Sequence, residues 1–142
     1  MPRKMPTPFG SKVTEISAGD THFGLVTDQG RVFTCGSNHR GQLGHYAQGL
    51  GEVQGLRSKV ISCGSNYTIL LTETGELMIA GQLPFKVDNK SYLRQFEQLA
   101  KFEKTVLVKQ IESTKFTSIL AQLPGEERTE LFLWGETPLG VF

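Results

Sequence analysis

The sequence predicts an all-β protein made of repeated antiparallel sheets, and three observations lead to this fold class. The first is an internal repeat, because shifting the 142-residue sequence by 45 positions superimposes identical residues, among them six pairs of which three are glycine. The second is a series of short runs rich in β-branched and aromatic residues, separated by turns that end in glycine. The third is the glycine content itself, 16 residues at regular places. A repeat this clear determines the fold, so its unit is described first.

The first unit runs from Ser17 to Gly44 and contains two expected strands, 22–27 and 31–35. Between them lies a three-residue loop that ends in Gly30. The last residue of such a hairpin loop usually adopts a left-handed backbone conformation, which glycine tolerates because it has no Cβ. A glycine-punctuated loop completes the unit.

The second unit repeats this pattern 45 residues later, with expected strands at 68–72 and 76–80 and a turn that ends in Gly75. The six superimposed pairs are Ile16 and Ile61, Ser17 and Ser62, Gly19 and Gly64, Thr27 and Thr72, Gly30 and Gly75, and Gly36 and Gly81.

A third, weaker copy follows. The segment 108–111 resembles 13–16, and 131–135, which ends in Trp134 and Gly135, takes the place of 77–81. Gly140 then stands five residues after Gly135, as Gly41 stands five after Gly36. A longer charged turn is expected at 124–128, which is tolerable because loop length costs little entropy.

The segments between the units are less regular. Residues 45–57 have no clean period and are expected to form a loop with a short extended end. In the connecting segment 84–105, apolar residues after a candidate cap at Ser91 follow an i, i+3, i+4 pattern, which favours a short helix over about 91–102. The alternative is a connecting strand plus loop, as in the other copies.

Composition excludes several classes of protein. The chain has 15 basic and 14 acidic residues and a formal charge of +1, so it offers no electrostatic case for binding nucleic acid or an anionic membrane. No apolar run approaches the roughly 20 residues of a membrane-spanning helix. The N-terminus lacks the apolar stretch of a secretory signal, and the two cysteines, Cys35 and Cys63, are too few for a disulfide framework. We therefore expect an intracellular protein, cytoplasmic rather than nuclear, with no membrane insertion.

No set of residues predicts catalysis or a cofactor. His22 aligns with Tyr67 and Thr117, so we interpret it as a hydrogen-bonding position that ties neighbouring strands together. The two cysteines align with small or apolar residues and are expected to be buried and unreactive. Cys35, His39 and His45 lie near one another but provide no fourth ligand and match no zinc spacing. No glycine loop has the pattern of a phosphate-binding site.

One cluster of side chains is a candidate for partner binding. His39, Arg40, His45 and Tyr46 flank the stretch Gly41-Gln42-Leu43-Gly44. Loops on a rigid scaffold often carry binding residues, and histidine, arginine and tyrosine suit protein interfaces. The alternative interpretation is an ordinary surface loop.

At these residues the chain resembles the regulator of chromosome condensation repeat family, whose members form seven-bladed β-propellers. The family pattern appears here as Ile16-Ser17-Ala18-Gly19, His22, Thr27-Asp28-Gln29-Gly30, Cys35-Gly36 and Asn38-His39-Arg40-Gly41-Gln42-Leu43-Gly44. The second copy matches through Gly81 and then lacks the loop motif, and the third copy keeps the tryptophan of the pattern as Trp134. The implied structural repeat positions are Gly19, His22, Gly30, Gly36, Gly41, Gly44, Gly64, Gly75, Gly81, Trp134, Gly135 and Gly140.

The resemblance implies one partial propeller domain over residues 1–142. Its repeats are placed at about 8–44 and 53–83, with the connecting segment 84–105 and a degraded repeat at about 106–142. Fewer than three full repeats cannot close a seven-bladed ring, so the outermost blades expose apolar faces and unpaired strand edges. We expect an N-terminal piece of a longer propeller, with Pro6-Thr7-Pro8 as its lead-in, or a chain that docks against another protein.

These features together predict a non-enzymatic protein-interaction scaffold, part of a larger protein or assembly, with protein partners and without a cofactor or a metal. The alternative that the resemblance implies is guanine nucleotide exchange on a small Ran-like GTPase. Exchange requires a surface that displaces the nucleotide and its Mg²⁺, and no individual residues of this chain can be assigned to it.

Overall fold

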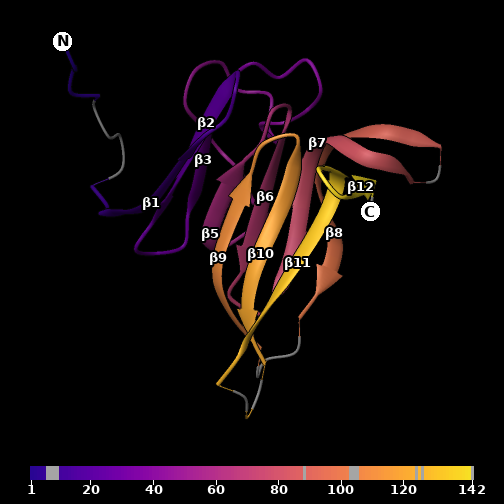
Figure 1. The fold of residues 1–142 in the computed structure, drawn as a ribbon. Coiled ribbons are helices and arrows are strands. Elements are labelled where there is room, and N and C mark those ends of the chain that lie inside the picture. Colours follow the sequence, from indigo (N-terminus) through magenta and orange to yellow (C-terminus); the bar gives the residue numbers. More distant parts are fainter. Residues whose placement is uncertain (6–9, 88, 103–105, 124, 126, 142) are drawn as a thin grey trace.

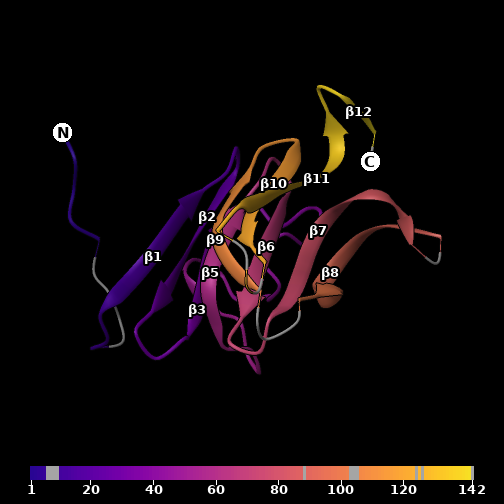
Figure 2. The same ribbon diagram turned by 60° about the horizontal axis from the view of Figure 1, so that its bottom comes forward.

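The computed structural model describes residues 1–5, 10–87, 89–102, 106–123, 125 and 127–141. Three four-stranded antiparallel sheets make up the fold (Figures 1 and 2). We call them blade 1 (residues 13–52), blade 2 (58–101) and blade 3 (107–141). Their strands are β1 Val13–Ala18, β2 His22–Thr27, β3 Val32–Gly36, β4 Gly51–Glu52, β5 Ser58–Cys63, β6 Tyr67–Thr72, β7 Glu76–Val87, β8 Lys90–Lys101, β9 Leu107–Ser113, β10 Phe116–Gln122, β11 Thr129–Thr137 and β12 Gly140–Val141.

Each sheet is a meander whose strands pair in sequence order. The first strand of every blade carries a bulge at the same place, where the pairing register shifts between Val13 and Glu15, between Ser58 and Val60, and at Leu120/Ala121 opposite β9. A β-bulge inserts one extra residue and increases the local twist. The three sheets are therefore copies of one unit, and the all-β fold predicted from the repeat is confirmed.

The hairpin between the second and third strands turns as the sequence predicts. Gly30 and Gly75 close the turns of blades 1 and 2 with φ angles of 77° and 85°. These values lie in the left-handed region, where a β-branched residue would be strained. The longer turn expected at 124–128 and the lead-in at 6–8 include residues outside the described ranges.

The short helix expected over about 91–102 is wrong, because this segment is strand β8, paired with β7. Its apolar residues have helical spacing, but the β7–β8 ladder shifts register between Leu77 and Met78 and between Ile79 and Gly81. At these two register shifts β8 has extra residues, so side chains an odd number of positions apart lie on the same face of the sheet. Pairing with the open edge of β7 therefore overrides the local helical pattern.

Hydrophobic cores lie between the blades rather than within any one of them. The core between blades 1 and 2 consists of Val26, Val32, Val53, Ile61, Cys63, Leu70 and Met78. The core between blades 2 and 3 consists of Tyr67, Ile69, Leu71, Leu77, Ile79, Leu83, Leu93, Ile111, Ile119 and Ala121. The first strands of adjacent blades contact one another, and β7 also contacts β11. Each blade is thus stabilised by the faces of its neighbours.

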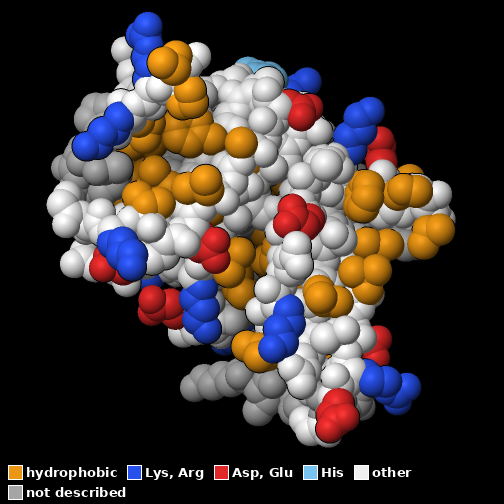
Figure 3. Space-filling model, turned by 60° about the vertical axis from the view of Figure 1, so that its left-hand side comes forward, with side chains coloured by type: hydrophobic (Ala, Val, Ile, Leu, Met, Phe, Trp, Pro, Cys, Tyr) orange, Lys and Arg blue, Asp and Glu red, His pale blue; other side chains and the backbone are white. Residues whose placement is uncertain are grey.

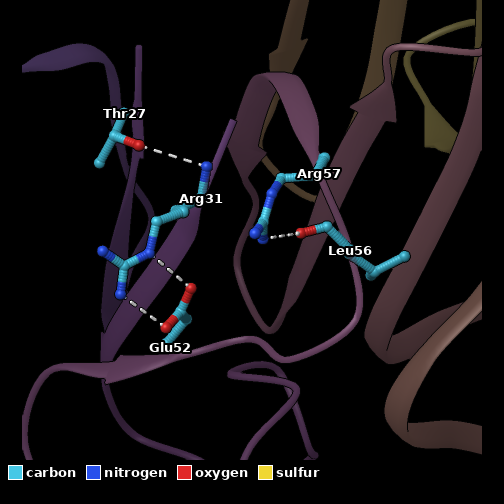
Figure 4. A network of polar contacts seen from close by, with 5 residues as sticks. All are labelled: Thr27, Arg31, Glu52, Leu56 and Arg57. Atoms are coloured by element: carbon cyan, nitrogen blue, oxygen red, sulfur yellow. Dashed lines mark hydrogen bonds and ion pairs between the residues drawn. The ribbon is translucent and has the colours of Figure 1, made fainter. Parts of the chain in front are cut away.

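An ion pair holds the short outer strand of blade 1. Nε and Nη2 of Arg31 each donate a hydrogen bond of 2.8 Å to the carboxylate of Glu52, one to each oxygen (Figure 4). Such a bidentate pair fixes the geometry as well as the charge. These hydrogen bonds hold the pKa of the Glu52 carboxyl below its ordinary value. β4 has only two residues, so this contact supplements the few ladder bonds that join it to β3.

Candidate functional site

The loop that follows β3 is the best-defined irregular element of the molecule, and Asn38 closes it. The Asn38 side chain accepts a hydrogen bond from the backbone N–H of Leu43 (3.0 Å) and donates one to the carbonyl of His45 (2.8 Å). Backbone bonds from Gly41 to Asn38 and from Gly44 to Gly41 complete two consecutive turns. The glycine-rich motif therefore encodes a compact loop with a fixed shape.

This loop fills the space between blades 1 and 2. Gln42 is fully buried, and its carbonyl accepts a hydrogen bond of 2.7 Å from the hydroxyl of Thr68 in blade 2. On the other side, the Thr34 hydroxyl in blade 1 donates to the carbonyl of Leu43 (2.7 Å). The loop is thus a wedge that joins the two sheets through hydroxyl groups from both.

The loop also packs closely against strand β8. A Cβ added at Gly41 would lie 2.4 Å from the Cα of Arg94, and one added at Gly44 would lie 2.3 Å from the Phe96 ring. Neither distance is possible for a real Cβ, so the two glycines allow the loop and β8 to touch.

His22 of blade 1 also contacts Thr68 of blade 2. Its Nε2 lies 2.7 Å from Thr68 Oγ1. The Thr68 hydroxyl donates its proton to the carbonyl of Gln42, so its oxygen is the acceptor in the hydrogen bond with His22. The donor is Nε2 of His22, which therefore carries the proton of the ring. Burial lowers the pKa of His22 below its ordinary value, and the carbonyl of Tyr67 and the Asp20 carboxylate offset part of this shift. The side chain is therefore a neutral donor that connects two blades.

The corresponding contact between blades 2 and 3 uses a tyrosine. The hydroxyl of Tyr67 lies 2.8 Å from Thr117 Oγ1, which is also 3.2 Å from Ser113 Oγ. The alignment of Thr117 with His22 is wrong by one residue. His22 pairs with Gly36 and Tyr67 with Gly81, whereas it is Phe116 that pairs with Gly135. Thr117 is instead the equivalent of Thr68, the acceptor of the contact.

The predicted partner-binding residues separate into two groups. His39 and Arg40 are exposed, and the Arg40 guanidinium lies 6.0 Å from the centre of the Tyr92 ring. Arg94 approaches the same ring at 5.2 Å. The sequence analysis missed Tyr92 and Arg94, because they lie some 50 residues away on β8 and were assigned to a helix. These four residues form an exposed surface of aromatic and cationic groups.

His45 belongs to the structure rather than to this surface. Its Nε2 is 3.0 Å from the carbonyl of Thr34, and its Nδ1 accepts the N–H of Ala47 at 3.1 Å. Both ring nitrogens are therefore in use. Tyr46 beside it is 68% exposed and points away from the core.

The cysteines and the remaining repeat positions are described by their burial and their backbone conformation. Cys63 is buried, which raises the pKa of its thiol to about 11, and Cys35 is only partly buried, less than expected. In the described part of the chain, no three His, Cys, Asp or Glu side chains form a metal-binding group. Positive φ angles occur at the repeat glycines of the third strands and of the segments that follow them, namely Gly36, Gly41, Gly44, Gly81, Gly135 and Gly140.

The buried histidine makes stability depend on pH. Because its pKa is lowered in the folded protein, the unfolded chain binds more protons below about pH 6.5. Stability should therefore fall as the pH is lowered from 7.5 to 5.5, and His22→Tyr, the residue found at the equivalent position 67, should remove this component. Thermal unfolding followed by circular dichroism at each pH measures it. His39→Asn, at an exposed histidine, is the control, and an unchanged pH dependence in His22→Tyr would contradict the assignment.

The sheets and their contacts define a class of protein, namely a stack of β-propeller blades in which a hydroxyl contact joins each pair of neighbours. The known structures agree. Yeast RCC1 (Prp20), in its crystal structure with Kap60, superimposes with a TM-score of 0.80 at 22% sequence identity, over 96% of this chain and 32% of the yeast chain.

Sequence comparison identifies the repeat. Two models of the Regulator of chromosome condensation (RCC1) repeat match residues 13–42 and 29–71. The bovine Secretion-regulating guanine nucleotide exchange factor is 35% identical over 80 residues, which are 51% of this chain and 17% of that protein. The mouse X-linked retinitis pigmentosa GTPase regulator is 27% identical over 135 residues, 88% of this chain and 13% of that protein.

Residues 13–71 therefore match the regulator of chromosome condensation repeat, as the resemblance to the family predicted, and the fold is that of an incomplete propeller. The chain spans less than a fifth of the length of the two sequence relatives and about a third of the yeast structure. No helix in the described ranges is long and apolar enough to cross a membrane.

Proposed function

We propose that the chain is a non-enzymatic protein-interaction module whose open blade faces bind further β-structure. The observation that carries this proposal is the exposure of one isoleucine. Ile61 and Ile111 occupy the same position in β5 and β9 and are only 4% and 6% exposed, because each packs against the preceding blade. Ile16, their equivalent in β1, is 77% exposed.

Blade 3 has the same feature on its opposite face. Leu77 pairs with Leu71 in blade 2 and is 1% exposed, because blade 3 covers it. Leu131 pairs with Leu120 at the equivalent position in blade 3 and is 63% exposed. The repeat therefore places a core residue at each end of the stack, with no blade against it in the described chain.

Apolar faces of this kind usually mark interaction sites. Figure 3 views the molecule from the side of blade 1 and shows apolar side chains in patches between charged groups. Apolar contacts between sheet faces already hold the two inner interfaces together. A partner that presents an apolar β-sheet face therefore fits the open faces of blade 1 and blade 3. The nearly balanced charge of the chain favours recognition by shape and apolar contact over electrostatic attraction.

The test is cross-linking of the purified chain to proteins that copurify with it from its source, with the linked positions mapped by mass spectrometry. Links should concentrate on the faces that carry Ile16 and Leu131, and Ile16→Lys should remove those on the face of blade 1. Gln98→Lys, on the exposed side of β8, is the control and should leave them. A folded, monodisperse chain that is inert toward every partner would refute the proposal.

A second candidate function is guanine nucleotide exchange on a small Ran-like GTPase. The likeness to the bovine exchange factor over 80 residues favours it. The exposed surface of His39, Arg40, Tyr92 and Arg94 is the place where such a GTPase would bind. Release of a fluorescent GDP analogue from a Ran-like GTPase, measured with and without the chain, distinguishes the two functions, because a scaffold alone leaves the release rate unchanged.

A further inference from the structure

A cavity of about 360 Å³ lies between blades 2 and 3, within the volume range of about 300–1,000 Å³ that is typical of ligand sites. Blade 2 contributes Asn66, Tyr67, Ile79 and Leu83 to its walls, and blade 3 contributes Phe116 and Trp134. A shallower depression adjoins it and shares Ser65, Lys115, Phe116 and Glu136 with it. The depression continues toward Asp20 of blade 1, so the two together form an elongated site.

The equivalent place between blades 1 and 2 is occupied. There the walls are Thr21, His22 and Thr34 of blade 1, and Ala80 and Gly81 of blade 2, which correspond in register to Asn66, Tyr67, Ile79, Trp134 and Gly135. The occupant is the loop 38–44: Gln42 donates to the Thr21 hydroxyl at 3.4 Å, and its Cα lies 3.1 Å from the Cβ position of Gly81. The molecule thus contains one filled copy of the site.

The second copy is open because the chain takes another path after Gly81. After Gly36 it enters the wedge loop, whereas after Gly81 it continues as β7 to Val87 and returns as β8. Figure 1 shows this hairpin projecting from the side of the molecule. The part of blade 2 that would have covered the interface is therefore used for a longer sheet.

We propose that this cavity is a binding site for a peptide segment of another protein, a short turn that carries a leucine-sized apolar side chain, as the loop 38–44 does in the filled copy. The inference extends the proposed interaction function to a site distinct from the open blade faces. In the filled copy Leu43 is 3% exposed, and its own carbonyl and that of Gln42 each accept a hydrogen bond from a threonine hydroxyl. The ligand enters the same position from a second chain.

The walls indicate how the preferred ligand differs from the wedge loop. Ile79 replaces Thr34, whose hydroxyl binds the carbonyl of Leu43, and Trp134 replaces Ala80. The Thr117 hydroxyl, equivalent to Thr68, lies 2.8 Å from the Tyr67 hydroxyl, as Thr68 lies 2.7 Å from Nε2 of His22. The open site therefore lacks the Thr34 hydroxyl donor and has more apolar surface, which favours an apolar side chain. Asn66, Lys115 and Glu136 at the rim remain as polar contacts for the peptide backbone.

The chain has a single tryptophan, Trp134, and it lines the cavity, so its fluorescence reports on binding. The probe is a synthetic peptide with the sequence of residues 37–45, SNHRGQLGH, titrated into the full chain. We expect a saturable change in tryptophan emission. The same peptide with aspartate in place of its leucine is the matched control and should bind at least about tenfold more weakly. Equal binding of the two peptides, or no change in emission with either at millimolar concentration, would overturn the proposal.

Variants of the chain locate the binding. Asn66→Phe places a ring in the cavity and should weaken the peptide at least about tenfold, whereas Gln48→Phe, in an exposed loop, should leave its affinity unchanged. Circular dichroism verifies that both variants are folded, and calorimetry measures binding independently of fluorescence. Ile16→Lys separates this proposal from the proposed function, because it should impair cross-linking at the blade 1 face and leave peptide binding intact. Peptide binding that is lost in Ile16→Lys but unaffected by Asn66→Phe would place the site elsewhere.

Discussion

Replacing Ile69 with alanine should lower the free energy of unfolding by about 2–5 kcal/mol. Ile69 lies in the central strand β6, is fully buried and belongs to the core between blades 2 and 3. Removing its side chain leaves a cavity between two sheets that are held by ladders on either side, so the walls cannot collapse into the space. Urea denaturation of the variant and the parent chain, followed by circular dichroism, gives the difference.

Ile16→Ala is the matched control for this experiment, because it makes the same chemical change at an isoleucine that is 77% exposed. Its effect should stay below about 1 kcal/mol, as most surface substitutions do. Losses of similar size in the two variants would show that blades 2 and 3 do not pack through this core.

Replacing Gly19 with alanine should cost about 3 kcal/mol, at the upper end of the range for overpacked sites. A Cβ at position 19 would lie 2.1 Å from the carbonyl oxygen of Gly64 in the next blade. The backbone lies on both sides of this contact, so the steric clash can be relieved only if the two sheets move apart and their shared core opens. The variant should lose stability in urea denaturation, and the amides of blade 1 should exchange faster in deuterated solvent.

The third blade provides the control. Thr114 follows β9 as Gly19 follows β1 and Gly64 follows β5, and it already carries a Cβ. Thr114 is exposed, so Thr114→Ala should change the free energy of unfolding by no more than about 0.5 kcal/mol. A Gly19→Ala chain as stable as the parent would mean that the blades are not in contact at this point.

The parts of the fold that follow from local chemistry could be predicted from the sequence. Gly30 and Gly75 stand where a three-residue hairpin loop needs a left-handed residue, and both adopt that conformation. The 45-residue shift places equivalent residues of blades 1 and 2 in the same register. Local turn geometry and self-similarity therefore suffice for these two blades.

The errors arose where distant contacts decide the structure. β8 has a helical apolar pattern, and only the bulged ladder with β7 converts it to a strand. The alignment of blade 3 slipped by one residue because it matched residues 118–120 to 68–70 by their similarity, whereas strand pairing makes Phe116 the equivalent of Tyr67. The cavity beside Trp134 could not be predicted, because the sequence shows that the loop motif is missing after Gly81 but not that its absence leaves space between two sheets.

The position of the hydrophobic cores between sheets has a consequence for how the molecule comes apart. Blade 2 contributes to both cores, whereas blades 1 and 3 each contribute to one. In such a nearest-neighbour arrangement, an end unit separates by breaking a single interface, and the middle unit cannot unfold without both. The chain should therefore fray from its ends inward, with blade 2 as the last cooperative unit. Because a blade at an end shares only one interface, whole blades can be added or deleted there in evolution while the remaining interfaces keep their stability.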